Sequence, residues 1–143
     1  MSRFDEMRIF SGTGNPALAN AISSYIGVRQ GEISIRTFPN ENIFVKIEES
    51  VREQDVFVVQ SFGSPLSHSI MELLIMLDAF KRSSAGRITA VLPYFAYSRT
   101  DKKDQPRVPI TGRLLADLIV AAGAERVLTL DLHAGQIQGF FSI

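Results

Sequence analysis

Short apolar runs alternate along the chain with longer segments in which apolar positions recur every three or four residues. Runs of the first kind predict β-strands, and the longer spacing predicts α-helices with a buried face. The expected strands cover residues 7–12, 33–38, 43–47, 55–60, 87–93 and 126–134. Three helices are expected: one starting at Asn15 and Pro16, one over residues 66–81, and one over residues 110–124 that ends at Gly123.

The order of these elements is typical of a parallel α/β domain, in which helices connect strands that are apolar on both faces. One pair of strands departs from this pattern. Residues 33–38 alternate between apolar and polar, and the turn-forming segment FPNEN separates them from residues 43–47. We therefore predict a hairpin there and a mainly parallel sheet for the rest of the chain.

Two apolar segments predict contacts beyond this chain. Between residues 70 and 80 only Glu72 and Asp78 are charged, so this helix is either deeply buried or packed against another subunit. We therefore predict self-association. The sequence ends with QIQGFFSI, and natural domains rarely end on exposed aromatic residues, whose burial is worth roughly 1.5–3 kcal/mol each. We expect these residues to be the first part of a longer chain.

Composition excludes several classes of function. The chain has 143 residues with 15 basic and 15 acidic side chains, and this zero net charge argues against a nucleic-acid-binding or membrane-surface protein. It has no cysteine, which excludes disulfides, cysteine-based zinc sites and thiol catalysis. The sequence contains neither a signal peptide nor a run of about 18 apolar residues. A cytoplasmic location is the default expectation.

In open parallel sheets, ligands bind at the carboxyl ends of the strands, so the loops that follow the strands are the places to search. The loop SGTGNPA has Gly12, Gly14 and Ala17 at the spacing of a dinucleotide-binding turn, although Pro16 lies inside it. A dinucleotide-binding module and a plain tight turn are both open. The loop QSFGSPLSHS leads into a helix N-terminus that could hold a phosphate. His68 in that loop is either a ligand or a polar residue of the first helical turn.

The segment PYFAYSRTDKKDQPRVPITG, residues 93–112, is the richest candidate. Arg and Lys are the side chains that bind polyphosphates, and aromatic side chains suit the flat ring of a nucleobase. Asp101 and Asp104 could position a metal ion or orient the cations. The alternative is a solvated charged loop. The cations of this segment are Arg99, Lys102, Lys103 and Arg107.

A possible metal-binding pair follows the last strand. Asp131 and His133 alternate, so in an extended chain they point to the same side. One oxygen and one nitrogen ligand, with room for water, suit Mg²⁺ or Mn²⁺ carrying phosphates better than a closed zinc site. Together with the cationic segment, this pair predicts a site for a metal–nucleoside triphosphate.

At these residues the sequence resembles ribose-phosphate pyrophosphokinase, also called phosphoribosyl pyrophosphate synthetase. The resemblance runs over the whole chain and includes FSGTGNPALA, RTFPNEN, VVQSFGSP and the stretch from MELLIMLDAF to GQIQGFF. Its most specific feature is YSRTDKK followed at this spacing by DLHAGQIQGFF.

The resemblance implies a fold and an activity. The fold is a three-layer α/β domain of phosphoribosyltransferase type, with a mainly parallel central sheet flanked by helices. Residues 1–143 would be the first of two such domains, and the second would bring the catalytic loop and the loop that binds the ribose phosphate. The complete enzyme transfers the diphosphoryl group of Mg-ATP to ribose 5-phosphate, giving phosphoribosyl pyrophosphate and AMP. These residues alone are expected to be inactive.

The resemblance also implies roles for particular residues. The turn that contains Phe38, Asn40 and Asn42 would contact the adenine from a neighbouring subunit, and Asp131 and His133 would hold magnesium. No catalytic residue is assigned within this chain. The expected ATP-binding residues are Phe38, Asn40, Glu41, Asn42, Arg99, Thr100, Asp101, Lys102, Lys103, Asp104 and His133.

Three positions depart from the usual family pattern. Asn42, Thr100 and Ser142 stand where the family typically has Glu, Gln and Asp. A non-catalytic regulatory subunit associated with the synthetase is the alternative, although Arg99 and the Asp131/His133 pair speak against it. The expected partners are ATP, ribose 5-phosphate and further copies of the protein, without nucleic acid or membrane.

Overall fold

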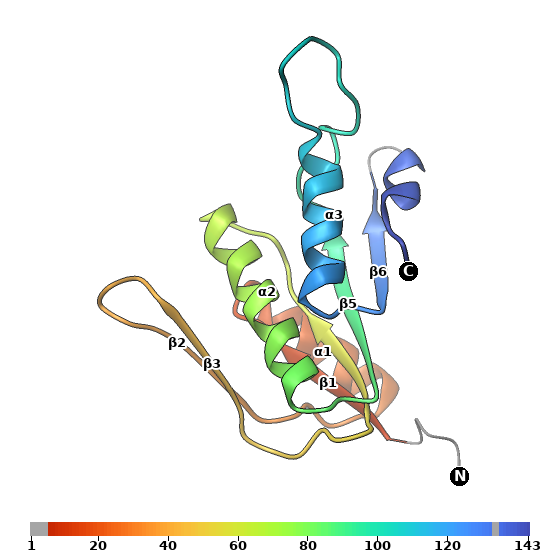
Figure 1. Ribbon diagram of the computed structural model, residues 1–143. Coiled ribbons are helices and arrows are strands. Elements are labelled where there is room, and N and C mark those ends of the chain that lie inside the picture. The colour runs from red at the N-terminus through yellow and green to blue at the C-terminus, as the bar shows by residue number, and fades with distance from the viewer. Residues whose placement is uncertain (1–5, 133–134) are drawn as a thin grey trace.

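The computed structural model describes residues 6–132 and 135–143 (Figure 1). Its centre is a four-stranded parallel sheet in the order β1-β4-β5-β6. The mainly parallel sheet expected from the sequence is therefore confirmed. Its strands are β1 (Met7–Ser11), β4 (Asp55–Val59), β5 (Arg87–Tyr94) and β6 (Arg126–Asp131).

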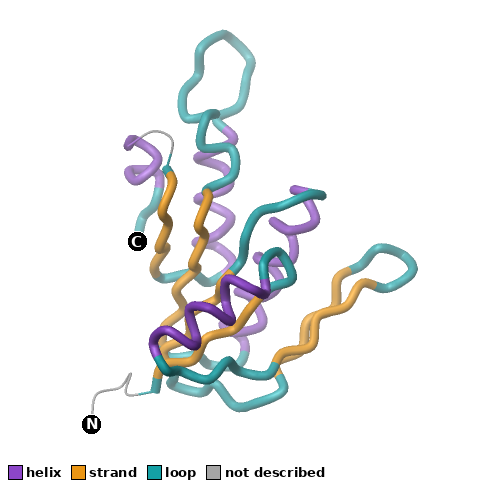
Figure 2. The backbone as a smooth tube through the Cα atoms, turned by 180° about the vertical axis from the view of Figure 1, so that it is seen from behind, coloured by secondary structure: helices purple, strands orange, loops and turns teal. Residues whose placement is uncertain are grey.

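Helices cover both faces of this sheet. The helix α1 (Pro16–Ile26) lies on one face, and α2 (Leu66–Arg82) and α3 (Thr111–Ala122) lie on the other, as the views from the front and from behind agree (Figure 1, Figure 2). A short 3₁₀ helix, η1 (Gly135–Phe140), follows β6. The expected three-layer arrangement is confirmed.

Local sequence signals explain where the helices begin and end. The Asn15 side chain accepts a hydrogen bond from Leu18 N at 3.1 Å and so caps α1, while Pro16 occupies a position that needs no donor. Gly27 has φ 70° and ends α1 in the left-handed conformation that glycine adopts without strain. Gly123 ends α3, as the sequence predicted.

The main core lies between the sheet and the two helices α2 and α3. Phe10 of β1 and Phe80 of α2 are fully buried, with ring centroids 4.7 Å apart and planes tilted by 54°. Neighbouring residues of the strands point to opposite faces, so Ile9 packs in a smaller cluster on the α1 side. A pair of aromatic rings therefore packs β1 against α2 within this core.

The predicted hairpin is present as β2 (Ile33–Thr37) and β3 (Ile43–Ile47), paired antiparallel. It extends away from the sheet in both views (Figure 1, Figure 2). Its apolar face packs against the core near α2 through Ile33, Ile35, Val45 and Ile47.

The two apolar segments that predict contacts beyond this chain differ in how they are buried within it. The helix α2 is not buried all round, because Met71 is 51% exposed while the charged Glu72 is only 1% exposed. The terminal aromatic rings are not exposed either. Phe141 packs edge-to-face on Phe95 at 5.4 Å between centroids, and Phe140 is also partly buried. Phe141 finds its partner directly after β5, which the sequence pattern does not show.

The sheet face on the α1 side is covered incompletely. An apolar groove of about 380 Å³ runs between α1 and the strands β5 and β6. Leu128 and Leu130 line it from β6 and are both exposed. Among the described residues, no helix is long and apolar enough to span a membrane.

Candidate functional site

The carboxyl ends of β5 and β6 adjoin, and the cationic segment begins there. Tyr94 is paired with Asp131 in the parallel ladder, and Phe95 N donates a hydrogen bond to Asp131 O at 3.3 Å. Asp131 therefore lies beside the root of the loop that connects β5 to α3. The structure brings together the strand ends that the sequence predicted to share a site.

The root of this loop is folded tightly against the start of α3. Thr100 N donates to Tyr97 O at 2.9 Å, and Gly112 N donates to Thr100 O at 3.0 Å. A Cβ at position 112 would lie 3.0 Å from both of these carbonyl oxygens, which is tighter than an ordinary contact, so glycine suits this close approach. Ser98 is buried and Arg99 is exposed. The backbone on either side of Arg99 is thus fixed, while its guanidinium faces solvent.

A second set of contacts ties the loop and the first turn of α3 to η1. The Gln136 side-chain amide donates to the Asp101 carboxylate, and the Arg113 guanidinium lies 5.9 Å from the centroid of the Phe140 ring. Ile137 of η1 is fully buried next to Gly112. Asp101 is therefore occupied by a neighbouring side chain and orients η1 against the loop.

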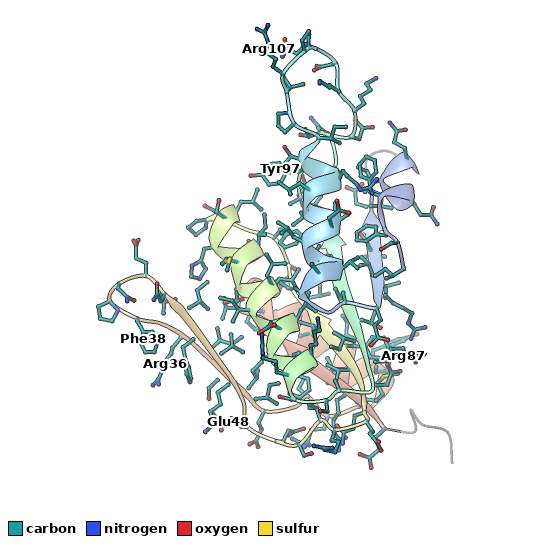
Figure 3. The ribbon with its side chains drawn as sticks, viewed as in Figure 1. Arg36, Phe38, Glu48, Arg87, Tyr97 and Arg107 are labelled. Atoms are coloured by element: carbon teal, nitrogen blue, oxygen red, sulfur yellow. The ribbon has the colours of Figure 1, made fainter. Side chains whose placement is uncertain are left out.

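The cations of the loop do not all lie together. Arg99, Lys102 and Lys103 follow the root of the loop, are exposed, and form no ion pair with any residue that the structure describes. Arg107 projects from the far end of the loop, away from the sheet (Figure 3). The expectation that Arg107 joins the other cations at the sheet edge is therefore wrong for this conformation. The loop extends outward instead of folding back over the strands.

Asp131 has the properties of a magnesium ligand. Its carboxylate is exposed at the end of β6 and makes no hydrogen bond or ion pair to another described residue. Magnesium is commonly held by one or two carboxylates together with substrate phosphates and water, so a single free carboxylate beside a cationic loop fits that ion. His133, the second predicted ligand, lies outside the described residues. Within 6–132 and 135–143, no three acidic or His side chains cluster as a metal site.

The other predicted nucleotide-binding residues form the turn of the β2–β3 hairpin. Phe38 N donates to Asn42 O and Glu41 N donates to Phe38 O, both at 2.8 Å, while the Asn40 side chain accepts from Asn42 N at 3.1 Å. Glu41 has φ 69°, the left-handed conformation that several types of tight turn contain. This tip and the cationic loop are at different extremities of the molecule in both views (Figure 1, Figure 2). One chain therefore does not bring the two sets together.

A buried polar network explains the glycine-rich loop after β1. Glu72 of α2 accepts hydrogen bonds from Thr13 N at 2.8 Å, Thr13 Oγ1 at 2.7 Å and Gln60 Nε2 at 2.6 Å. Gln60 Oε1 accepts from Gly14 N at 3.1 Å. A Cβ at Gly12 would lie 2.1 Å from Gln60 Oε1. The loop's donors are therefore used within the protein, which favours the tight turn over a dinucleotide site.

Sequence reasoning missed this network. From the sequence, Glu72 is interpreted only as a charge in an apolar helix. Its position among apolar neighbours was the available signal that the carboxylate is buried. Such a residue needs hydrogen-bonding partners, which here come from two loops at the carboxyl edge of the sheet. The network holds α2 against the loops that follow β1 and β4.

Two shifted pKa values lie away from this edge of the sheet. A hydrogen bond from Arg87 to Asp55 raises the pKa of the Arg87 guanidinium, and it joins the amino ends of β4 and β5. On the hairpin, a hydrogen bond from Ser34, with a smaller effect of Lys46, lowers the pKa of Glu48. Both shifts arise from structural ion pairs and hydrogen bonds.

The fold and this edge define a three-layer α/β domain of phosphoribosyltransferase type with a cationic loop and a free carboxylate at adjoining strand ends. Residues 7–123 match the family described as the N-terminal domain of ribose phosphate pyrophosphokinase. The chain belongs to this family.

Individual relatives agree with this assignment. A ribose-phosphate pyrophosphokinase of Brucella melitensis is 58% identical over 137 residues, covering 96% of this chain and 44% of the relative. One from Deinococcus radiodurans is 53% identical over 142 residues, covering 99% of this chain and 44% of the relative. The crystal structure of phosphoribosylpyrophosphate synthetase from Mycobacterium smegmatis superposes with a TM-score of 0.94 at 48% identity, covering 96% of this chain and 46% of that one. The chain thus spans less than half the length of these relatives.

Proposed function

We propose that the full-length protein transfers the diphosphoryl group of Mg-ATP to the 1-hydroxyl of ribose 5-phosphate, giving phosphoribosyl pyrophosphate and AMP. The observation that carries this proposal is the meeting of the Arg99 loop and Asp131 at adjoining strand ends, through the hydrogen bond from Phe95 N to Asp131 O. Cations and a metal-binding carboxylate at one edge suit the charge of a triphosphate. The names of the relatives support the same reaction.

Magnesium would be held by Asp131 and His133 together with the phosphates of ATP. The ion would neutralise phosphate charge as the diphosphoryl group is transferred. Arg99 would bind the phosphates by charge-assisted hydrogen bonds, with Lys102 and Lys103 beside it. Thr100, Asp101 and Asp104 belong to the same proposed ATP-binding loop, in which Asp101 is already bonded to Gln136.

The adenine would be bound by Phe38, Asn40, Glu41 and Asn42 at the hairpin tip of another copy of the chain. This arrangement is supported by the separation of the tip from the cationic loop within one chain (Figure 1). It requires self-association, so the working form would be a homo-oligomer. A cytoplasmic location stays a prediction.

The test is formation of AMP from ATP and ribose 5-phosphate by the full-length protein in the presence of Mg²⁺, followed by chromatography. We expect activity in the wild type and a loss of at least about 100-fold in kcat/KM for Arg99→Ala, because removal of a group that stabilises developing charge typically has that effect. Arg107→Ala is the matched control, since Arg107 lies at the far end of the same loop (Figure 3). Equal losses in both variants would contradict the role of Arg99.

The 143-residue chain alone is expected to form no AMP, because the proposed second domain would bind the ribose phosphate. Measurable AMP formation by this chain would contradict that expectation. A full-length protein that is folded but inactive would instead favour the regulatory-subunit alternative.

A further inference from the structure

The β2–β3 hairpin has two chemically different faces. Its odd-numbered apolar residues pack towards α2, and its even-numbered residues therefore lie on the outward face. Figure 3 shows Arg36, Phe38 and Glu48 on that face. Near the body of the molecule this outward face is polar, because the Glu48 carboxylate accepts from Ser34 Oγ at 2.7 Å and pairs with Lys46 at 3.2 Å.

Near the tip, the outward face carries a cluster of one cation and two aromatic rings. Arg36 is paired directly with Phe44 across the hairpin, and its Cζ lies 4.6 Å from the centroid of the Phe44 ring. The same Cζ lies 5.5 Å from the centroid of Phe38, and the two ring centroids are 5.7 Å apart. The guanidinium thus contacts both rings, and it forms no ion pair with any described residue.

The Phe38 ring is partly exposed, so its contacts with Arg36 and Phe44 can affect its orientation. Hydrogen bonds within the turn fix the backbone of Phe38, but its side chain is 40% exposed and points away from the core. A ring in that position loses conformational entropy when a ligand stacks on it, unless contacts within the free protein already restrict its rotation. Arg36 and Phe44 are the neighbours that can supply this restriction.

We propose that Arg36 is a positioning residue, which holds the Phe38 ring in the orientation that stacks on adenine through its simultaneous contact with Phe44. This inference rests on the proposed function, in which Phe38 contacts the adenine of ATP. Arg36 acts through Phe38 and contributes to the affinity for ATP. It has no part in the transfer of the diphosphoryl group, so it changes ATP affinity and leaves the rate of the bound complex unaltered.

The experiment compares variants of the full-length protein. Arg36→Met removes the charge and the planar group but keeps an apolar stem, and Phe44→Leu removes the ring that supports Arg36. Lys46→Met is the matched control, because it removes a cation from the same face that pairs with Glu48 and lies across from Ser34. Light scattering on each variant checks that assembly is unchanged.

We expect Arg36→Met and Phe44→Leu to raise KM for ATP by about threefold to tenfold, in line with the strength of cation–π contacts. Their kcat and their KM for ribose 5-phosphate are expected to stay within about twofold of wild type. Arg36→Lys should recover part of the affinity, because ammonium also binds aromatic faces. Lys46→Met is expected to behave as wild type.

Different results would contradict the role of Arg36 and the proposed function of the full-length protein. If the wild type is active but Arg36→Met has a wild-type KM for ATP, or loses kcat instead, the role of Arg36 is wrong and the proposed function stands. Loss of assembly in Arg36→Met, with Phe44→Leu unchanged in KM, also counts against that role. If the folded wild type forms no AMP, both the function and this inference fail.

Discussion

Glu72 shows at the scale of one residue how a buried charge is stabilised without a cation. Its two carboxylate oxygens accept from Thr13 and Gln60, and no Lys or Arg that the structure describes pairs with it. Glu72→Gln offers one acceptor oxygen in place of two, and its amide group would face donors. We expect the free energy of unfolding to fall by about 1–3 kcal/mol, measured by urea denaturation of this chain.

The control for this prediction is Glu32→Gln, which makes the same change at an exposed side chain without a hydrogen bond among the described residues. Within the described part of the chain, Glu32 forms hydrogen bonds only through its backbone N–H and C=O, so substitution of its side chain should leave the free energy of unfolding unaltered. Equal unfolding midpoints for the two variants would mean that the network around Glu72 is not needed for stability.

The hairpin gives a prediction at the scale of an element. The hydrogen bond from Ser34 across to Glu48, and then Lys46, lower the Glu48 pKa below its usual value of 4.5. Because the pKa of Glu48 is lower in the folded than in the unfolded chain, its carboxylate stabilises the fold fully at pH values above the unfolded pKa. This contribution is lost as the pH falls through the folded pKa. Ser34→Ala is expected to move the Glu48 pKa upward, measured by NMR titration of its side-chain carboxyl. Ser24→Ala, in α1, is the control and should leave that titration unchanged.

Elements with local signals could be predicted from the sequence. The helix start at Asn15, the helix end at Gly123 and the alternation of the hairpin all depend on neighbouring residues. Partners far apart in the chain could not be predicted. Thr13 and Glu72 are separated by 59 positions, and no periodicity indicates that one side chain binds the other.

In the candidate site, too, some features follow from a general rule and others do not. The rule that ligands meet the carboxyl ends of parallel strands predicted that Asp131 adjoins the loop after β5, because the order of elements fixes that edge. No such rule predicts the course of the loop itself. Arg107 follows Arg99 closely in sequence but projects from the outer end of the loop (Figure 3). Whether His133 completes the predicted metal pair stays a prediction.

For the whole molecule, the two faces of the sheet differ in how completely they are covered. Two helices and η1 pack on one face, whereas α1 alone packs on the other and leaves the groove beside β5 and β6. Alternation along β6 sends Val127 and Thr129 to the first face and Leu128 and Leu130 to the second. The apolar pattern predicted a strand buried on both sides, so the exposure of these leucines could not be read from it.

This asymmetry predicts where the 143-residue chain binds hydrophobic probes. Leu130 is 87% exposed and lines the apolar groove. Such a groove is a suitable site for a hydrophobic dye such as ANS. Leu130→Lys should reduce dye fluorescence roughly twofold or more, because it places a charge where the dye packs. Leu114→Lys is the control: Leu114 is 54% exposed on α3, across the sheet from the groove. An equal reduction in the two variants would mean that the dye binds elsewhere, because Leu130 lines the groove and Leu114 does not.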